Sequence, residues 1–233
     1  MRLTWFGHSA FRVEFGAVRM MIDPFIPNPT YKGNAREAAA GCTHVLVTHG
    51  HNDHVGAAVE ISRETGAQVV GAAELCDWFV AQGIAGNKVN PGNHGGTVDC
   101  GGFSVSFVNA LHSSSYGGDE GAVYLGNPLG LIVAAEGQPT LYHLGDTGIF
   151  GDMQLIGEIY RPEIGLVPIG DRYTMGARLA AMACKRFFKF RIIVPCHYGT
   201  FAALDQSPDK FRAELGADAD KLLVPERGKP VEL

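Results

Sequence analysis

The first 23 residues alternate hydrophobic and polar positions, which is the pattern of half-buried β-strands. Turn sequences at 7–9 and 16–17 divide them, so residues 3–23 predict a meander of three short strands. Residues 24–36 contain three prolines and predict a loop that drapes over a site. We expect this loop and a second one at 113–121 to shape a pocket.

The pattern then alternates between apolar strands and amphipathic helices. Residues 44–49 predict a strand that is buried on both faces, because almost every position is apolar. A helix over 55–66 ends at Gly66, a strand follows at 67–71, and a second helix covers 72–83. This order is a β-α-β-α unit.

Residues 97–145 return to strands, joined by Asn-Pro-Leu-Gly and Glu-Gly-Gln-Pro turns, which predicts antiparallel pairing. After residue 150 the α/β alternation resumes, with these expected elements: a helix at 152–160, a strand at 164–170, a helix at 176–188, a strand at 191–197 and a helix at 207–216. Because no polar linker interrupts the chain, we expect a single α/β domain over residues 1–233, with layered sheets and outer helices.

Composition narrows the class of protein. Hydrophobic residues make up 46% of the chain, enough for a buried core, and 31 glycines indicate many tight turns. Lys and Arg number 19 against 24 Asp and Glu, so the net charge is −5 and the basic surface of a nucleic-acid-binding protein is not expected. Neither a membrane span nor a signal peptide is apparent. The five scattered cysteines favour a reducing compartment without disulfides, so we expect a cytoplasmic protein.

Five of the nine histidines fall within the first 54 residues. Where the apolar strand ends and a helix begins, the chain places His49, His51, Asp53 and His54, which are all metal-ligand types. Crowding them into one turn is repulsive once a histidine is protonated. A divalent cation removes that cost, because it binds neutral imidazole and ionised carboxylate directly. The alternative is a histidine-rich surface turn or a helix N-cap.

Three further ligand types end predicted strands just before loops, namely His112, Asp146 and His197. The carboxyl ends of strands are where α/β proteins place their sites. For any one of the three residues alone, a structural role is as good an interpretation as metal binding. As a set they complete the motif around His49 and His51, and two metals about 3.5–4 Å apart become an expectation.

Together these motifs resemble the metallo-β-lactamase superfamily of binuclear metal hydrolases. Within it, the chain is similar to a branch of metal-dependent hydrolases related to the phosphorylated-ascorbate lactonases. The similarity runs from residue 1 to about residue 205 and rests on further motifs: Gly7-His8-Ser9-Ala10, Ile22-Asp23-Pro24, His112-Ser113-Ser114-Ser115, Gly145-Asp146-Thr147-Gly148, Tyr173-Thr174-Met175-Gly176 and Pro195-Cys196-His197-Tyr198-Gly199-Thr200. The resemblance implies an α/β fold, the four-layer αββα sandwich with two mixed sheets and outer helices.

The resemblance also implies a ligand set for two divalent metal ions. It divides seven ligands between one metal, the other metal and a bridge: His49, His51 and His112; Asp53, His54 and His197; and Asp146. A hydroxide held between the metals would be the nucleophile, and Asp53 would pass a proton to the leaving group. Zinc (Zn2+) suits such ligands best, with Mn2+, Fe2+ or Ni2+ as alternatives.

Departures from other branches of the superfamily sharpen the expected activity. Asp146 and the missing signal peptide argue against a true β-lactamase. His51 argues against the redox branch, which has a carboxylate at that position. The RNA-processing branch carries an added domain, for which 233 residues leave no room.

Several residues keep two interpretations. His8 either approaches the metals from the second sheet or is structural, and Asp23 either orients a ligand histidine or caps a turn. Candidate substrate contacts are Thr174, Tyr198, Arg172 and the serines at 113–115. The remaining histidines are expected to be structural: His44 in a strand, His94 in an exposed turn, and His143 behind the site or in the core.

We therefore expect a metal-dependent hydrolase that cleaves a small ester, lactone or phosphodiester. Two alternatives stay open, a nuclease acting on short single-stranded nucleic acid and a non-catalytic metal- or ligand-binding sensor. The expected partner is a small-molecule substrate, with no nucleic acid and no membrane. Apolar residues near 177–190 leave a homo-oligomer open.

Overall fold

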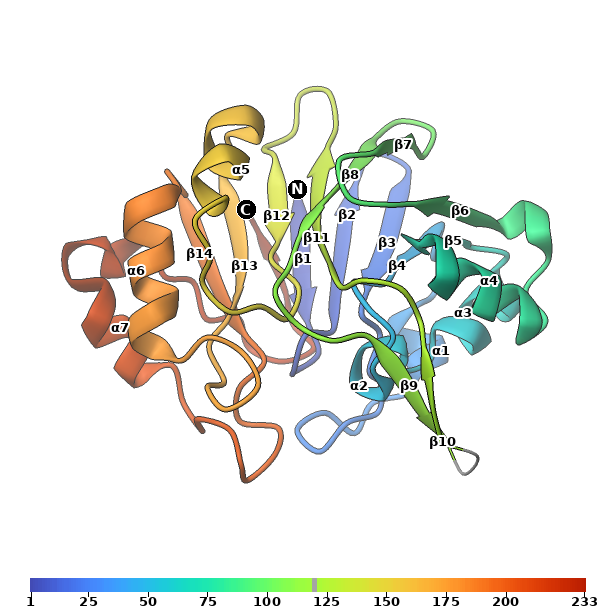
Figure 1. The fold of residues 1–233 in the computed structure, drawn as a ribbon, viewed down its shortest axis with the longest axis horizontal. Coiled ribbons are helices and arrows are strands. Elements are labelled where there is room, and N and C mark those ends of the chain that lie inside the picture. The colour runs from blue at the N-terminus through green and yellow to red at the C-terminus, as the bar shows by residue number, and fades with distance from the viewer. Residues whose placement is uncertain (119–120) are drawn as a thin grey trace.

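Two large sheets stand face to face in the centre of the fold (Figure 1). The computed structural model describes residues 1–118 and 121–233. The seven-stranded sheet has the order β15-β1-β2-β3-β4-β5-β6. Its strands are β1 (Arg2–Trp5), β2 (Phe11–Phe15), β3 (Val18–Ile22), β4 (His44–Leu46), β5 (Gln68–Ala72), β6 (Val89–Gly92) and β15 (Pro230–Glu232).

The six-stranded sheet has the order β14-β13-β12-β11-β8-β7. Its strands are β7 (Thr97–Asp99), β8 (Ser104–Asn109), β11 (Leu129–Ala134), β12 (Leu141–His143), β13 (Ile164–Pro168) and β14 (Ile192–Cys196). As the turn sequences predict, β7, β8, β11 and β12 pair antiparallel.

Helices cover the outer side of each sheet (Figure 1). The helices beside the first sheet are α1 (Ala35–Ala38), α2 (Asn52–Val55), α3 (Ala58–Thr65) and α4 (Ala73–Ala81). The helices beside the second sheet are α5 (Met153–Tyr160), α6 (Ala177–Phe187) and α7 (Asp209–Leu215). Two 3₁₀ turns lie at Gly86–Lys88 and Gly216–Lys221. Helical spacing explains the packing of α6, which buries Ala180, Ala183 and Cys184 on one face. The layers confirm the four-layer αββα sandwich.

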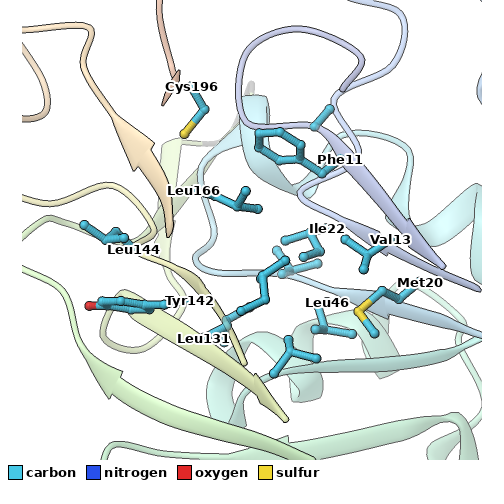
Figure 2. Close-up of a cluster of buried hydrophobic side chains, with 14 of the residues drawn as sticks. Phe11, Val13, Met20, Ile22, Leu46, Leu131, Tyr142, Leu144, Leu166 and Cys196 are labelled. Atoms are coloured by element: carbon cyan, nitrogen blue, oxygen red, sulfur yellow. The ribbon is translucent and has the colours of Figure 1, made fainter. Parts of the chain in front are cut away.

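The core lies between the two sheets (Figure 2). Both sheets contribute large side chains to it: Phe11, Val13, Met20, Ile22 and Leu46 from the first, and Leu131, Tyr142, Leu144, Leu166 and Cys196 from the second or the residue that follows a strand. Close packing of this kind resists deformation, so the ends of the strands that border the core are held in place. All five cysteines are free and buried, as expected for a chain without disulfides.

The parallel parts of the two sheets position the site. In the first sheet β3, β4, β5 and β6 are parallel, and in the second β12, β13 and β14 are parallel. The carboxyl ends of parallel neighbours meet at one edge of a sheet. Residues that directly follow these strands are therefore gathered at that edge.

One predicted helix is wrong in its extent. The helix expected over 55–66 begins only at Ala58, as α3, and Gly56 separates it from the short α2, which ends at Val55. Gly56 has φ +44°, and a Cβ there would lie 2.3 Å from the carbonyl oxygen of Pro24. The loop after β3 packs so closely on this point that the chain bends there, which the sequence pattern of the helix alone does not reveal.

The two predicted loops also hold regular structure. Within 24–36, α1 begins at Ala35, and within 113–121 the chain forms the hairpin β9 (Ser115–Gly118) and β10 (Gly121–Tyr124). Residues 119 and 120 of the second loop lie outside the described residues. The side chain of Asn52 pins this hairpin to α2, because its amide donates to the carbonyl of Gly117 and its oxygen accepts from the amide of Gly117.

The chain end adds a strand that the pattern does not predict. β15 pairs antiparallel with β1, so the two ends of the chain lie side by side in the first sheet. Within the described ranges, every helix is too short or too polar to cross a membrane.

Candidate metal centre

The strand ends gather the predicted ligand side chains. His49 and His51 follow β4, His112 follows β8, Asp146 follows β12 and His197 follows β14. The short helix α2 then supplies Asp53 and His54 from its first turns. Four segments, those after β4, β8, β12 and β14, therefore converge because their strands end at one edge of the sandwich.

The donor atoms form two groups. The first group is His49, His51 and His112; the second group is His8, Asp53, His54 and His197; in each, the donor atoms lie within 4.8 Å of one another. A third set, His49, His54 and Asp146, meets the same distance and joins the two groups. The division follows the two halves of the expected ligand set, with His8 added to the second.

Asp146 lies between the two groups. Its Oδ2 is 2.9 Å from Nε2 of His197 and 3.3 Å from Nε2 of His54, both in the second group. The same oxygen is 3.5 Å from Nε2 of His112 and 4.0 Å from Nε2 of His49, both in the first group. One buried carboxylate can therefore serve cations on either side.

Electrostatics in the site favour a bound cation. Burial lowers the pKa of His49, His51 and His112 and keeps them neutral, the form in which imidazole binds metal. Burial alone would raise the pKa of Asp146, but the imidazoles of His197 and His54 lower it well below its usual range. Burial likewise opposes charge on His54, yet Asp146 and Asp23 raise its pKa well above the usual value. The negative charges of Asp146 and Asp23 are therefore stabilised by nearby positive charge, and a divalent cation can supply such a charge.

Asp23 orients two of the ligands from behind. Its Oδ2 accepts a hydrogen bond from Nδ1 of His54 at 2.7 Å and from the hydroxyl of Thr48, also at 2.7 Å. The Thr48 hydroxyl oxygen is in turn 3.0 Å from Nδ1 of His49. Since an ionised carboxylate only accepts, Nδ1 of His54 carries a proton, so Nε2 is the nitrogen that can bind a metal; the same holds for His49 through Thr48.

His8 reaches the second group from the turn between β1 and β2. Its Nε2 is 2.9 Å from Oδ2 of Asp53, and its Nδ1 is 3.0 Å from Oγ1 of Thr200. Burial, together with the nearby His197, lowers the pKa of His8 to about 4. Burial alone would raise the pKa of Asp53, but the hydrogen bond from His8 and the nearby His54 lower it overall.

Unpartnered polar atoms test whether a metal fits. Among the described residues, His54 Nε2 and Asp146 Oδ1 are buried without a hydrogen-bond partner. Buried polar atoms are rarely left this way, because an unmade hydrogen bond is costly. Both atoms belong to the set that joins the two groups. Imidazole nitrogens and carboxylate oxygens suit zinc and similar divalent ions, so the donor set fits metal binding.

The backbone is strained at three residues of the site. His8, Asp23 and His197 have φ values of +50°, +45° and +56°, a region that non-glycine residues rarely adopt. The amide of His197 donates to the carbonyl of His8, which also accepts from the indole of Trp5. These bonds hold two strained turns against each other, as is common at functional sites.

The structure does not bring every candidate residue into the donor groups. Tyr198 is buried and its ring stacks on Trp5 with centroids 5.4 Å apart, so it packs in the core instead of lining an open site. The hydroxyl of Thr174 donates to the carbonyl of Met175, and Arg172 is exposed beside Tyr173.

The serines and the other histidines have clear places. Ser113 Oγ lies 3.3 Å from Nε2 of His51, whereas Ser114 is buried and accepts from the amide of Gly50. The three remaining histidines lie as the sequence suggests: His143 buried behind Asp23, His44 half-buried against Phe103, and His94 on an exposed turn.

Sequence reasoning missed the supporting role of three hydroxyl groups that hold the site, although the serine run that it named includes one of them. Thr48, Thr200 and Ser114 each bond a ligand or the loop that carries one. All three stand in or beside the sequence motifs, next to His49, two residues after His112 and shortly after His197, so their position is a signal. Their role is not readable, because a hydroxyl bonds whatever the fold places beside it.

Comparisons with known proteins agree with this geometry. The family model described as the beta-lactamase superfamily domain matches residues 2–197. The chain is 54% identical, over the full length of both proteins, to a UPF0173 metal-dependent hydrolase of Chelativorans sp. (strain BNC1), and equally to one of Mesorhizobium japonicum.

A solved structure supports the same relationship. The metallo hydrolase Igni18 of the hyperthermophilic archaeon Ignicoccus hospitalis superposes with a TM-score of 0.87. It is 36% identical, and the match covers 99% of this chain and 97% of that one. On its fold, its donor side chains and these relatives, the chain belongs to the metal-dependent hydrolases of the beta-lactamase superfamily.

Proposed function

We propose that this metal-dependent hydrolase uses two divalent metal ions to cleave a small ester, lactone or phosphodiester. The observation that carries the proposal is the position of Asp146, whose Oδ2 lies within 4.0 Å of imidazole nitrogens from both groups. A carboxylate that lies between two sets of donor side chains is suited to a pair of neighbouring cations.

The chain's own residues divide the work. His49, His51 and His112 would hold one ion, and three side chains of the second group would hold the other: Asp53, His54 and His197. Zinc fits this donor set best, with manganese, iron and nickel as alternatives. When bound, such a pair lowers the pKa of water enough to supply a nucleophile near neutral pH and polarises the scissile carbonyl or phosphoryl group.

Asp53 is the carboxylate best placed to exchange a proton with substrate. Its side chain is 29% exposed, against 2% for Asp146, so only Asp53 can meet a departing group without opening the core. The hydrogen bond from His8 holds one of its oxygens. We assign to Asp53 the transfer of a proton to the leaving group.

Metal content and turnover test the proposal. The protein is stripped of metal, reloaded with zinc or manganese, and assayed on p-nitrophenyl acetate, γ-butyrolactone and bis-p-nitrophenyl phosphate. We expect two ions per chain and metal-dependent hydrolysis of at least one substrate. His112→Ala should lose most of that activity, whereas His94→Ala, which changes an exposed turn, should keep it. Binding of a single ion, or no hydrolysis of any substrate after loading, would overturn the proposal.

A further inference from the structure

His8 connects the second group to a strand end on the opposite sheet. It is fully buried, and its ring nitrogens bond residues far away in the chain, Asp53 at 2.9 Å and Thr200 at 3.0 Å. Its ring is also packed on three sides, with centroid distances of 4.1 Å to His197, 5.8 Å to Phe25 and 5.5 Å to Phe201. The ring therefore has a single orientation in which both nitrogens are used.

The partners decide which nitrogen carries the proton. A carboxylate oxygen only accepts, so the bond between Nε2 of His8 and Asp53 requires a proton on Nε2. The Thr200 hydroxyl can donate or accept. Its oxygen lies 3.0 Å from Nδ1 of His8 but 3.3 Å from the carbonyl of Tyr198, so donation to Nδ1 is the shorter bond. A second proton on this ring would place charge among buried aromatic rings and against His197.

We propose that Thr200 and His8 are positioning residues of the second group. The Thr200 hydroxyl donates to Nδ1 and keeps the proton of His8 on Nε2. That N–H holds Oδ2 of Asp53 and so fixes the carboxylate beside the other donors of the second group. The inference rests on the proposed metal centre and names the side chains that set the geometry of its more exposed carboxylate.

This assignment separates His8 from the ligands beside it. One of its ring nitrogens lies within 4.8 Å of the donor atoms of Asp53, His54 and His197, so distance alone would make it a fourth ligand. A nitrogen that carries a proton has no lone pair for a metal. The other nitrogen, Nδ1, faces Thr200. His8 therefore acts on the metal only through Asp53.

Nitrogen-15 NMR of the zinc-loaded protein tests the tautomer directly. Two-bond correlations between ring protons and nitrogens show which nitrogen of each histidine is protonated, and the His8→Ala variant identifies the signals of His8. We expect the proton on Nε2 in the unaltered protein. Thr200→Val removes the donor to Nδ1 and should shift the Nδ1 signal of His8, whereas Thr200→Ser should keep the signal of the unaltered protein. A zinc-loaded His8 with its proton on Nδ1 would show that it is a ligand and would overturn the inference.

Metal affinity supplies a second readout. We expect Thr200→Val and His8→Ala to weaken the second zinc ion about 10–100-fold and to leave the first unchanged, as is typical for residues behind a ligand. The matched control is Thr65→Val, because the Thr65 hydroxyl also bonds a neighbour, the carbonyl of Ile61, but lies in α3. Equal affinities in Thr200→Val and the control contradict the inference. If the unaltered protein binds no second zinc, the proposed function fails, and the NMR result still reports the tautomer.

Discussion

The two donor groups differ in what holds them. In the second group, His54 is bonded to Asp23 and Asp53 to His8, and both supporting side chains are fully buried. In the first group, Nε2 of His49 lies 3.0 Å from Nδ1 of His51, so two ligands contact each other.

The outer contact of the first group is correspondingly weaker. Nε2 of His51 lies 3.3 Å from the exposed Ser113, and the side chain of His112 is 13% exposed. Buried hydrogen bonds do not compete with water, so they fix a ring more firmly than exposed ones. The side chains of the second group are therefore held by more buried hydrogen bonds than those of the first, in which Thr48 supports His49.

Removing the shared carboxylate should have the largest effect. Asp146→Ala takes away the oxygen that both groups face, so we expect loss of the second ion and a fall in kcat/KM beyond the ~10–100-fold of supporting residues. Metal content and substrate hydrolysis measure this. Asp152→Ala, which alters an exposed carboxylate before α5, is the control. A variant that keeps two ions and half its activity would show that the groups are independent.

Altering the buried support should affect one group more than the other. Asp23→Asn replaces an acceptor-only group with an amide, so His54 loses its fixed tautomer. We expect the affinity of the second ion to drop about 10–100-fold, measured by zinc titration against a competing chelator. Asp99→Asn changes an exposed aspartate in β7 and serves as control. Asp23 also contacts His49 of the first group, but only through Thr48. Equal weakening of both ions would show that this indirect contact matters as much as the direct bond to His54, and would contradict the difference between the groups.

Metal removal should proceed in two steps. The ion held by the first group should leave at a lower chelator concentration, because its ligands have fewer buried partners. A ligand at 100 times its Kd stabilises the folded state by about 2.7 kcal/mol, so each loss should lower Tm. Calorimetry during stepwise chelation measures both losses. Release of both ions in one transition would mean that the difference in support has no thermodynamic effect.

Two neighbouring serines offer the smallest and sharpest test. Ser113→Ala removes one exposed contact to His51, and we expect at most about 0.5 kcal/mol in the affinity of the first ion. Ser114→Ala leaves the buried amide of Gly50 without its partner and should reduce stability by about 1–3 kcal/mol. Zinc titration and urea unfolding of the pair give the comparison. A larger affinity loss in Ser113→Ala than in Ser114→Ala would refute the account of the first group.

Much of the fold was readable because its strands and helices are local patterns. The failures occurred where a distant segment intervenes. Gly56 breaks a helix because the loop after β3 packs on it, and β15 forms only because its partner β1 offers an edge. The first strand of the hairpin, β9, reads Ser-Tyr-Gly-Gly and is held by Asn52, so no hydrophobic period predicts it.

The sequence by itself determined which kinds of side chain gather and why. Imidazoles and carboxylates at the ends of apolar strands indicate a metal site, because parallel strands end at one edge of a sheet. Only the tertiary structure decided that Asp146 stands between the two groups, that Tyr198 packs on Trp5, and that His8 bonds Asp53. These outcomes depend on distances of a few ångströms between segments far apart in the chain. The type of a side chain determines which partners its polar atoms can bind, whereas the packing of the fold determines which partners lie close enough to be bound.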